Sequence, residues 1–120
     1  MPTPLACDLS KKKCVPCEGG VQPLSPAAVA KYLTGLPEWK LTSSGLGIER
    51  TWKCKDFLAA LDFCNKIAVI AEAEDHHPDL HLTGYRILRI EMTTHAIKGL
   101  SENDFILAAK IDEVPVEVKG

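Results

Sequence analysis

Short strand-like runs and helix-like runs alternate along this chain in an order that few folds accommodate. Two pairs of runs with β-type composition each flank turn residues, as hairpins do: 39–41 with 48–52, and 79–82 with 85–94. Helical runs precede, separate and follow these two predicted hairpins. The resulting order, α-β-β-α-β-β-α, predicts an α+β domain in which three helices pack on one face of a four-stranded antiparallel sheet.

Each helical run begins with residues that favour a helix start. Ser25 is a predicted N-cap, and Pro26 follows it at the first helical position. Asp56 is a predicted N-cap for the central helix. Ser101 and Asp104 match a capping box, in which the carboxylate satisfies free backbone amides. These residues predict where the three helices begin.

The central helix is predicted from apolar residues that recur at a spacing of three and four. Its predicted buried face consists of Phe57, Leu61, Cys64, Ala68 and Ala71, with Asp62 and Lys66 on the other side. Residues 67–70 are apolar all round, so we expect a second element or a second subunit to cover that end. Pro78 disfavours helical geometry at His77, so the helix should end close to the His76-His77 pair.

The N-terminal part of the chain differs in composition from the rest. Residues 1–23 hold four of the eight prolines and three consecutive lysines, with no apolar period that could bury a face. A chain of 120 residues has room for one domain. We therefore expect a flexible tail at 1–23 and one folded domain at 24–117.

Charge and hydropathy exclude two classes of partner. The net charge is −2 and the only basic run is 11–13, which argues against a nucleic-acid partner. No stretch approaches the roughly 18 apolar residues of a membrane helix, so no membrane partner is expected. The five cysteines are odd in number, which fits reduced thiols better than a disulfide framework. We expect a cytoplasmic protein.

Histidines are concentrated where the predicted elements meet. Three of the four lie within residues 76–81, and His95 is expected to end the last strand. Hairpin pairing could bring them together, and imidazole both gives and takes protons near neutral pH. The cluster therefore suits acid and base chemistry. The alternative interpretation is that these are ordinary surface histidines at loop ends.

The spacing of polar residues around the histidines is specific. Glu72 stands four residues before His76-His77-Pro78, His95 follows 18 residues after His77, and Asp104 follows nine residues later. These spacings resemble the signature of the pterin-4a-carbinolamine dehydratase family, and the resemblance spans residues 24 to about 114. The family's fold, three helices against a four-stranded antiparallel sheet, agrees with the order of elements. Leu80 departs from the pattern because some members have an aromatic residue there.

The resemblance implies a hydro-lyase that needs neither a cofactor nor a metal ion. It would convert 4a-hydroxytetrahydrobiopterin, a pterin-4a-carbinolamine, to quinonoid dihydropterin plus water, and so support tetrahydrobiopterin recycling. His76, His77 and His95 are the implied catalytic residues. The residues implied to bind substrate are Glu72, Asp75, His76, His77, Thr93, Thr94, His95 and Ala96. Members of the family are dimers or tetramers, so we expect a homodimer or homotetramer.

Individual roles are assigned less completely. By resemblance, His76 and His95 form the acid and base pair, while His77 binds substrate or shares the acid role; which histidine is the acid stays open. The carbonyl end of the central helix and its acidic residues favour imidazolium at His76 or His77. For Asp104 we expect a structural role in the capping box, the alternative being that it orients His95 or the substrate.

Two rival functions are compatible with parts of the sequence. The Cys14-x-x-Cys17 pair with His77-x-x-x-His81 superficially matches zinc-ligand spacing, but 59 residues separate Cys17 from His77, against about 12 to 15 in a zinc finger. A separate zinc clip on the tail stays possible. The second rival is a protein-binding module, because some members of the family serve as dimerisation partners of a transcription factor. The three histidines favour the enzyme.

Overall fold

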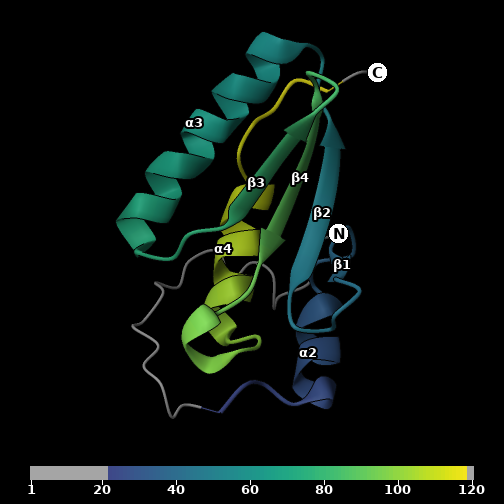
Figure 1. The fold of residues 1–120 in the computed structure, drawn as a ribbon, viewed down its shortest axis with the longest axis vertical. Helices are drawn as coiled ribbons and strands as arrows, with labels where there is room; N and C mark the ends of the chain where they lie inside the picture. The colour runs from purple at the N-terminus through teal and green to yellow at the C-terminus, as the bar shows by residue number, and fades with distance from the viewer. Residues whose placement is uncertain (1–21, 119–120) are drawn as a thin grey trace.

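The computed structural model describes residues 22–118, so the predicted tail, apart from its last two residues, lies outside the described part of the chain. The helices are α2 (Pro26–Leu33), α3 (Phe57–Glu74) and α4 (Glu102–Asp112), and a 3-10 helix, η1, spans His95–Ile97. The strands are β1 (Lys40–Leu41), β2 (Ile48–Lys53), β3 (Asp79–Thr83) and β4 (Ile87–Met92). This order confirms the predicted α-β-β-α-β-β-α succession (Figure 1).

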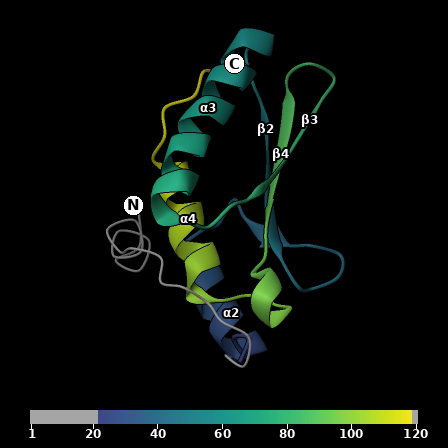
Figure 2. The same ribbon diagram turned by 60° about the vertical axis from the view of Figure 1, so that its left-hand side comes forward.

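The four strands form one antiparallel sheet, as predicted, and their order in it is β1-β2-β4-β3. Its register places Trp52 opposite Leu88 and Leu80 opposite Ile90, so these side chains share one face. Buried and half-buried residues alternate along β4, as expected for a sheet that is covered on one face only. Figure 2 shows α2, α3 and α4 together on one side of the sheet.

Helix α4 lies at the centre of the core. Eight of its eleven residues are buried, and Phe105 and Leu107 are completely inaccessible. Aromatic rings join the sheet to its surroundings: the Trp52 ring of β2 meets Trp39 at 5.8 Å and Phe63 of α3 at 5.2 Å, both edge to face. Edge-to-face contacts are favoured because the positive edge of one ring meets the negative face of the other. Any functional side chain on α4 is therefore held on a rigid element.

The far end of α4 is tied to the sheet by Asp112. Its Oδ1 accepts hydrogen bonds from Trp39 Nε1 at 2.9 Å and from Arg50 Nη1 at 2.7 Å. Burial raises the pKa of the Asp112 carboxyl, while Trp39 and Arg50 oppose that rise. A carboxylate at the carbonyl end of a helix is unfavourable by itself. The two donors therefore hold an anion where the helix alone would disfavour it.

The predicted buried face of α3 is wrong for Phe57, Leu61 and Ala68, whereas Cys64 packs against the core and Ala71 is buried, as predicted. Its buried residues are Ala60, Phe63, Ile67 and Ala71, of which only Ala71 was predicted. The side chains of Phe57 and Leu61 remain 48% and 40% exposed, and Ala68 is exposed as well. The helix carries apolar residues on more than one side, so its own periodicity does not tell which side meets the sheet. The predicted N-cap, Asp56, is confirmed, its carboxylate accepting from the Ala59 amide.

The last strand is shorter than predicted at both ends. Gly84 and Tyr85 have positive φ angles of 53° and 55°, so β4 begins only at Ile87. At the other end β4 stops at Met92, and His95 begins η1 instead of ending the strand. The reason is that Thr94 pairs with Gly99, its amide donating to the Gly99 carbonyl at 2.9 Å. This bridge closes a tight loop that carries His95 on its first helical turn.

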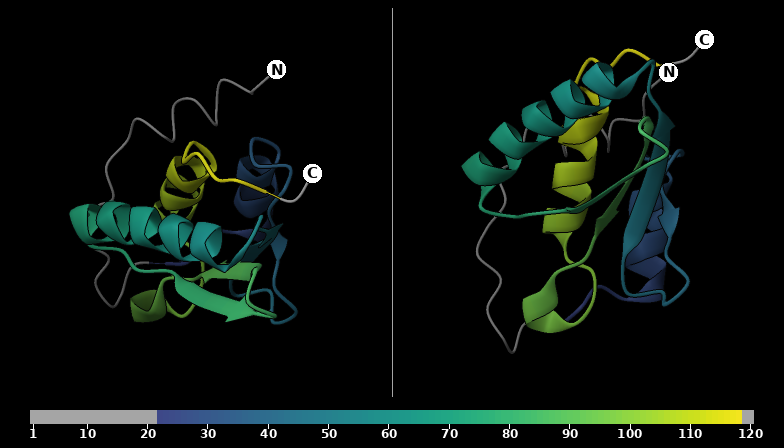
Figure 3. Two further views of the ribbon diagram at one scale, coloured as in Figure 1. Left: turned by 90° about the horizontal axis from the view of Figure 1, so that it is seen from above. Right: turned by 45° about the horizontal axis from the view of Figure 1, so that its top comes forward.

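The segment after α4 returns to the end of β2 (Figure 3). There the Lys55 amide donates to the Glu117 carbonyl at 2.9 Å, and Cys54 forms a β-bridge with Val118. Val116 packs against the core. The strands are antiparallel, so the end of β2 lies beside the start of β4, at the opposite end of the sheet from η1. The histidine-bearing end is therefore free of this C-terminal segment.

Candidate active site

A sharp corner joins α3 to β3 and carries two of the predicted catalytic histidines. The helix ends at Glu74, and Asp75 adopts the left-handed conformation with φ 50°. The amide of His76 then donates to the Ala71 carbonyl at 3.2 Å, which closes the helix end. Pro78 follows and directs the chain into β3. The predicted helix end beside the histidine pair is confirmed, and the corner lies at the left of Figure 1, where α3 ends.

His76 points back into the domain and meets α4. Its Nε2 lies 2.8 Å from Oδ1 of Asp104, and its side chain is only 12% exposed. Asp104 is fully buried at the third position of α4, where its carboxylate also serves the predicted capping box, which is confirmed. The free amides and positive dipole end of the helix favour an anion there. A buried carboxylate thus faces the ring of His76.

The second oxygen of Asp104 is held by the loop that follows β4. Its Oδ2 accepts the amide of Ser101 at 3.0 Å and the hydroxyl of Thr94 at 2.8 Å. The hydroxyls of Thr94 and Ser101 are 2.7 Å apart. Thr94 immediately precedes His95, so the corner after α3 and the loop that carries His95 meet at one carboxylate.

His77 lies on the outside of the same corner. Its Nε2 is 2.8 Å from Oε1 of Glu72, one helical turn earlier on α3. Both side chains are largely exposed, at 54% and 78%, so solvent screens this pair strongly. Glu72, which the family resemblance implies as a substrate-binding residue, thus contacts His77 in the structure.

Four of the remaining predicted binding residues form the loop from Thr93 to Ala96, and the fifth is Asp75 at the end of α3. His95 and Ala96 are exposed in η1, and Asp75 is exposed at the end of α3. The Thr93 hydroxyl donates to the Leu46 carbonyl at 2.6 Å, which fastens the loop to the first hairpin. Thr94 differs from these residues because it is only 4% exposed and its hydroxyl is already engaged.

His81 lies apart from the other three histidines. It is opposite Arg89 in the sheet, on the face that the helices do not cover, whereas its neighbours Leu80 and Leu82 face the helices. Its Nε2 is 3.9 Å from Oε1 of Glu91. His81 is therefore not part of the group of side chains around Asp104.

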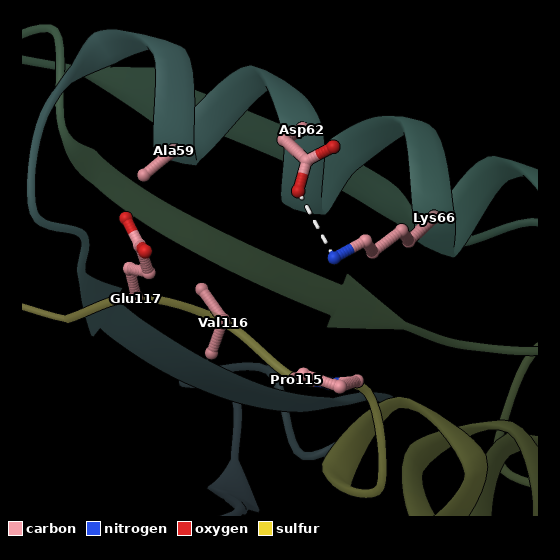
Figure 4. Close-up of a pocket in the computed structure, with 6 residues that line it drawn as sticks. All are labelled: Ala59, Asp62, Lys66, Pro115, Val116 and Glu117. Carbon is pink, nitrogen blue, oxygen red and sulfur yellow. Dashed lines mark ion pairs between the residues drawn. The ribbon is translucent and has the colours of Figure 1, made fainter.

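The recess drawn in Figure 4 also lies away from the histidines. It has a volume of about 310 Å³ between α3 and the C-terminal segment, and an ion pair of 3.0 Å joins Lys66 to Asp62 at its edge. The side chains that line it are Ala59, Asp62, Lys66, Pro115, Val116 and Glu117. None of these groups pairs imidazole with a carboxylate, so the recess offers no acid and base pair.

Metal ligation and membrane insertion have no counterpart in the described residues. Within residues 22–118, no three side chains of His, Cys, Asp or Glu are arranged to hold a metal ion. The Cys14 and Cys17 pair lies outside that range. The helices of the same range are also too short or too polar to cross a membrane.

Sequence reasoning named two members of the buried network without placing them together in it. Ser101 was predicted only as a helix cap, and Thr94 only as a substrate-binding residue. The capping-box spacing did reveal the contact between Ser101 and Asp104. The pairing of Thr94 and His76 with the same carboxylate joins three separate elements, and no spacing along the chain could reveal it.

Comparison with known proteins places these residues in one family. The sequence profile described as pterin 4 alpha carbinolamine dehydratase matches residues 22–114. A protein of Methylococcus capsulatus with the provisional name pterin-4-alpha-carbinolamine dehydratase is 45% identical over 93% of this chain and 97% of its own length. Pterin-4-alpha-carbinolamine dehydratase 2, mitochondrial, of Arabidopsis thaliana is 48% identical over 92% of this chain and 60% of its own length.

A solved structure shows the same fold. The crystal structure of a transcriptional coactivator/pterin dehydratase from Brucella melitensis superposes with a TM-score of 0.71 at 30% identity. The match covers 76% of this chain and 96% of the Brucella chain. The helices and sheet described above are therefore those of a solved pterin dehydratase.

Proposed function

This chain belongs to the pterin-4a-carbinolamine dehydratase family, and we propose that His76, His77 and His95 perform the dehydration at the corner after α3. The protein is a dehydratase that removes water from a pterin-4a-carbinolamine. We further propose that its substrate is 4a-hydroxytetrahydrobiopterin and that the product, quinonoid dihydropterin, enters tetrahydrobiopterin recycling. The observation that supports the site best is the buried pair of His76 and Asp104, 2.8 Å apart.

The reaction needs two proton transfers at separate points of the substrate. The bond from C4a to the hydroxyl oxygen breaks, and the hydroxyl leaves as water after taking a proton from an acid. A ring nitrogen gives up its proton to a base, and the electron pair of that N–H bond forms the new double bond. Two imidazoles in opposite protonation states supply both functions, since histidine exchanges protons near neutral pH.

The three histidines differ in their surroundings, and the difference suggests roles. His76 is held by a buried carboxylate, so its ring orientation is fixed before substrate arrives. His95 is exposed at the start of η1, so its ring is accessible to a bound pterin. His77 pairs with the exposed Glu72, which suits contact with substrate at the rim. We assign His76 and His95 to proton transfer and His77 to binding or a shared acid role.

Replacing the histidines tests this assignment. We expect His76→Ala or His95→Ala to slow carbinolamine dehydration at least tenfold in a stopped-flow assay, because acid or base groups contribute about 10²–10⁴-fold. His81→Ala is the matched control, since His81 lies on the uncovered face of the sheet, and it should change the rate little. Unchanged rates in both single variants and in their double variant would overturn the mechanism.

We also propose that the protein is a cytoplasmic homodimer or homotetramer that requires no cofactor. Support for assembly comes from α3, where Leu58 and Val69 are 78% and 71% exposed on the outward side. Contiguous patches of exposed apolar side chains mark protein interaction surfaces. Val69→Asp should lower the mass measured by light scattering if copies join there. The same face is the surface that a protein partner would use under the alternative, non-enzymatic function.

A further inference from the structure

The hydroxyl of Thr94 is buried beside the proposed site, and its neighbours are other polar groups of the protein. It donates to Oδ2 of Asp104 at 2.8 Å, and it lies 2.7 Å from the Ser101 hydroxyl. A hydroxyl has a single proton, and an ionised carboxylate can only accept. Because Thr94 gives its proton to Asp104, the proton between the two hydroxyls must come from Ser101. The direction of this chain, from Ser101 to Thr94 to Asp104, is therefore fixed.

This series of hydrogen bonds determines which ring nitrogen of His76 carries the proton. Oδ2 of Asp104 receives two donors, the Thr94 hydroxyl and the Ser101 amide, whereas His76 faces Oδ1 alone. Donors of this kind stabilise the ionised form of a carboxylate. An ionised Asp104 requires a proton on Nε2 of His76 at the 2.8 Å contact. In the neutral ring, Nδ1 is then the atom that can accept a proton.

Loss of the Thr94 hydroxyl would disturb the hydrogen bonds that place the proton on Nε2 of His76. Oδ2 would keep only the Ser101 amide, in a position with no solvent to replace the missing donor. A carboxylate that has lost one of its donors is held less firmly, so its contact with Nε2 of His76 is no longer fixed in place. Without a fixed acceptor at Nε2, the neutral ring of His76 can carry its proton on Nδ1 as well.

We propose that Thr94 is a positioning residue, which acts through Asp104 to keep His76 in the tautomer that carries its proton on Nε2. The inference rests on the proposed function, because it concerns His76 as a proton-transfer group. It reassigns Thr94 from the substrate contact that sequence analysis predicted, since the hydroxyl is saturated and Thr94 is 4% exposed.

The test replaces Thr94 by valine, which keeps its shape and removes its hydroxyl, and by serine, which restores a donor. The ring nitrogens of His76 are read by long-range ¹H–¹⁵N correlation spectra of the labelled protein without substrate. We expect Thr94→Val to turn a single Nε2–H tautomer into a mixture and to lower kcat about tenfold, with KM within about twofold. Thr94→Ser should recover the tautomer and most of kcat.

A control substitution at a buried position at the other end of α4 distinguishes an effect on the His76 tautomer from a general loss of stability. Ile111→Val, at a fully buried position, should lower the melting temperature without changing the His76 tautomer or kcat. If Thr94→Val merely lowers the melting temperature, and both tautomer and kcat stay those of the wild type, the proposal is overturned. A tautomer shift with normal turnover would uphold the ordering by Thr94 and would overturn the catalytic role of His76.

Discussion

At the scale of single residues, Asp104 combines two functions that usually belong to different side chains. One oxygen serves the start of α4 through the Ser101 amide, and the other faces His76. The predicted capping role is confirmed, and the structure adds a contact with His76, where His95 had been considered as the alternative partner. The Asp104 carboxylate that stabilises the start of α4 therefore also serves as the partner of the His76 imidazole.

The double use of Asp104 makes its removal costly in two ways. Asp104→Ala should lower the free energy of unfolding by about 1–3 kcal/mol, because buried donors lose their acceptor. Turnover should fall at least tenfold, because His76 loses its carboxylate. Urea unfolding and stopped-flow turnover measure the two effects. Asp104→Ser, which keeps a short acceptor for the Ser101 amide, should recover stability more than turnover; equal recovery of both would contradict the double role.

Tyr32 gives a second prediction at this scale. Burial, with the hydrogen bond to Glu102 at 2.7 Å, raises the pKa of the Tyr32 hydroxyl to about 12. The folded state therefore holds this proton more tightly than the unfolded state. Its contribution to stability is complete below about pH 10, the ordinary tyrosine value, and is lost as the pH rises toward 12.

An absorbance titration of the phenolate at 295 nm checks this value. Tyr85 is the only other tyrosine, so a Tyr85→Phe variant reports Tyr32 alone. We expect its titration midpoint well above pH 10, or alkaline unfolding before it is reached. A midpoint near pH 10 in the folded protein would show that the contact with Glu102 is not formed.

At the scale of elements, α3 is the least determined by its own sequence. Its ends follow from Asp56 and Pro78, but the side that faces the sheet does not. Two phenylalanines on this helix have opposite surroundings, because Phe63 is 1% exposed and packs on Trp52, whereas Phe57 is 48% exposed. They form a matched pair for measuring how much each side of the helix contributes.

We expect Phe63→Ala to lower the free energy of unfolding by about 3–5 kcal/mol, the usual cost of an aromatic cavity in a core. Phe57→Ala should cost under about 1 kcal/mol in the isolated subunit, because much of that ring is already in water. Denaturant unfolding at low protein concentration measures both. Equal losses would mean that the outward side of α3 is buried as well, as assembly through it would require.

At the scale of the whole molecule, the fold separates structural from chemical tasks. The C-terminal segment closes the sheet at Cys54, while His76, Thr94 and Asp104 meet at the opposite end. The core itself runs from Val29 to Ile111. The N-terminal side enters this body at Leu24, whose amide donates to the Leu100 carbonyl at 2.8 Å.

These boundaries predict the outcome of an N-terminal deletion. We propose that residues 24–117 form the domain, since the family profile matches 22–114 and the buried cluster lies within that range. Deletion of residues 1–20 should leave the melting temperature within a few degrees and turnover within about twofold. Differential scanning calorimetry and stopped-flow turnover measure these effects. A large loss in either would show that the deleted residues contribute to the domain.

Much of this protein was determined by local features of its sequence. The caps at Ser25, Asp56 and Ser101 predicted three helix starts, because a cap acts within one turn of its own chain. The turn residues predicted both hairpins, and the spacing from Glu72 to Asp104 identified the family. These predictions succeeded because each depends on residues that are close in sequence or on intervals that can be counted.

Only the tertiary structure decided which groups meet. The buried side of α3 depends on the shape of the sheet beneath it, and apolar residues on several sides left that choice open. The contacts of Asp104 with His76 and Thr94 span 28 and 10 residues and join three elements. Such contacts form because packing of α4 against α3 and β4 buries a carboxylate that must then be satisfied. That requirement arises only once the core has closed, so no local pattern records it.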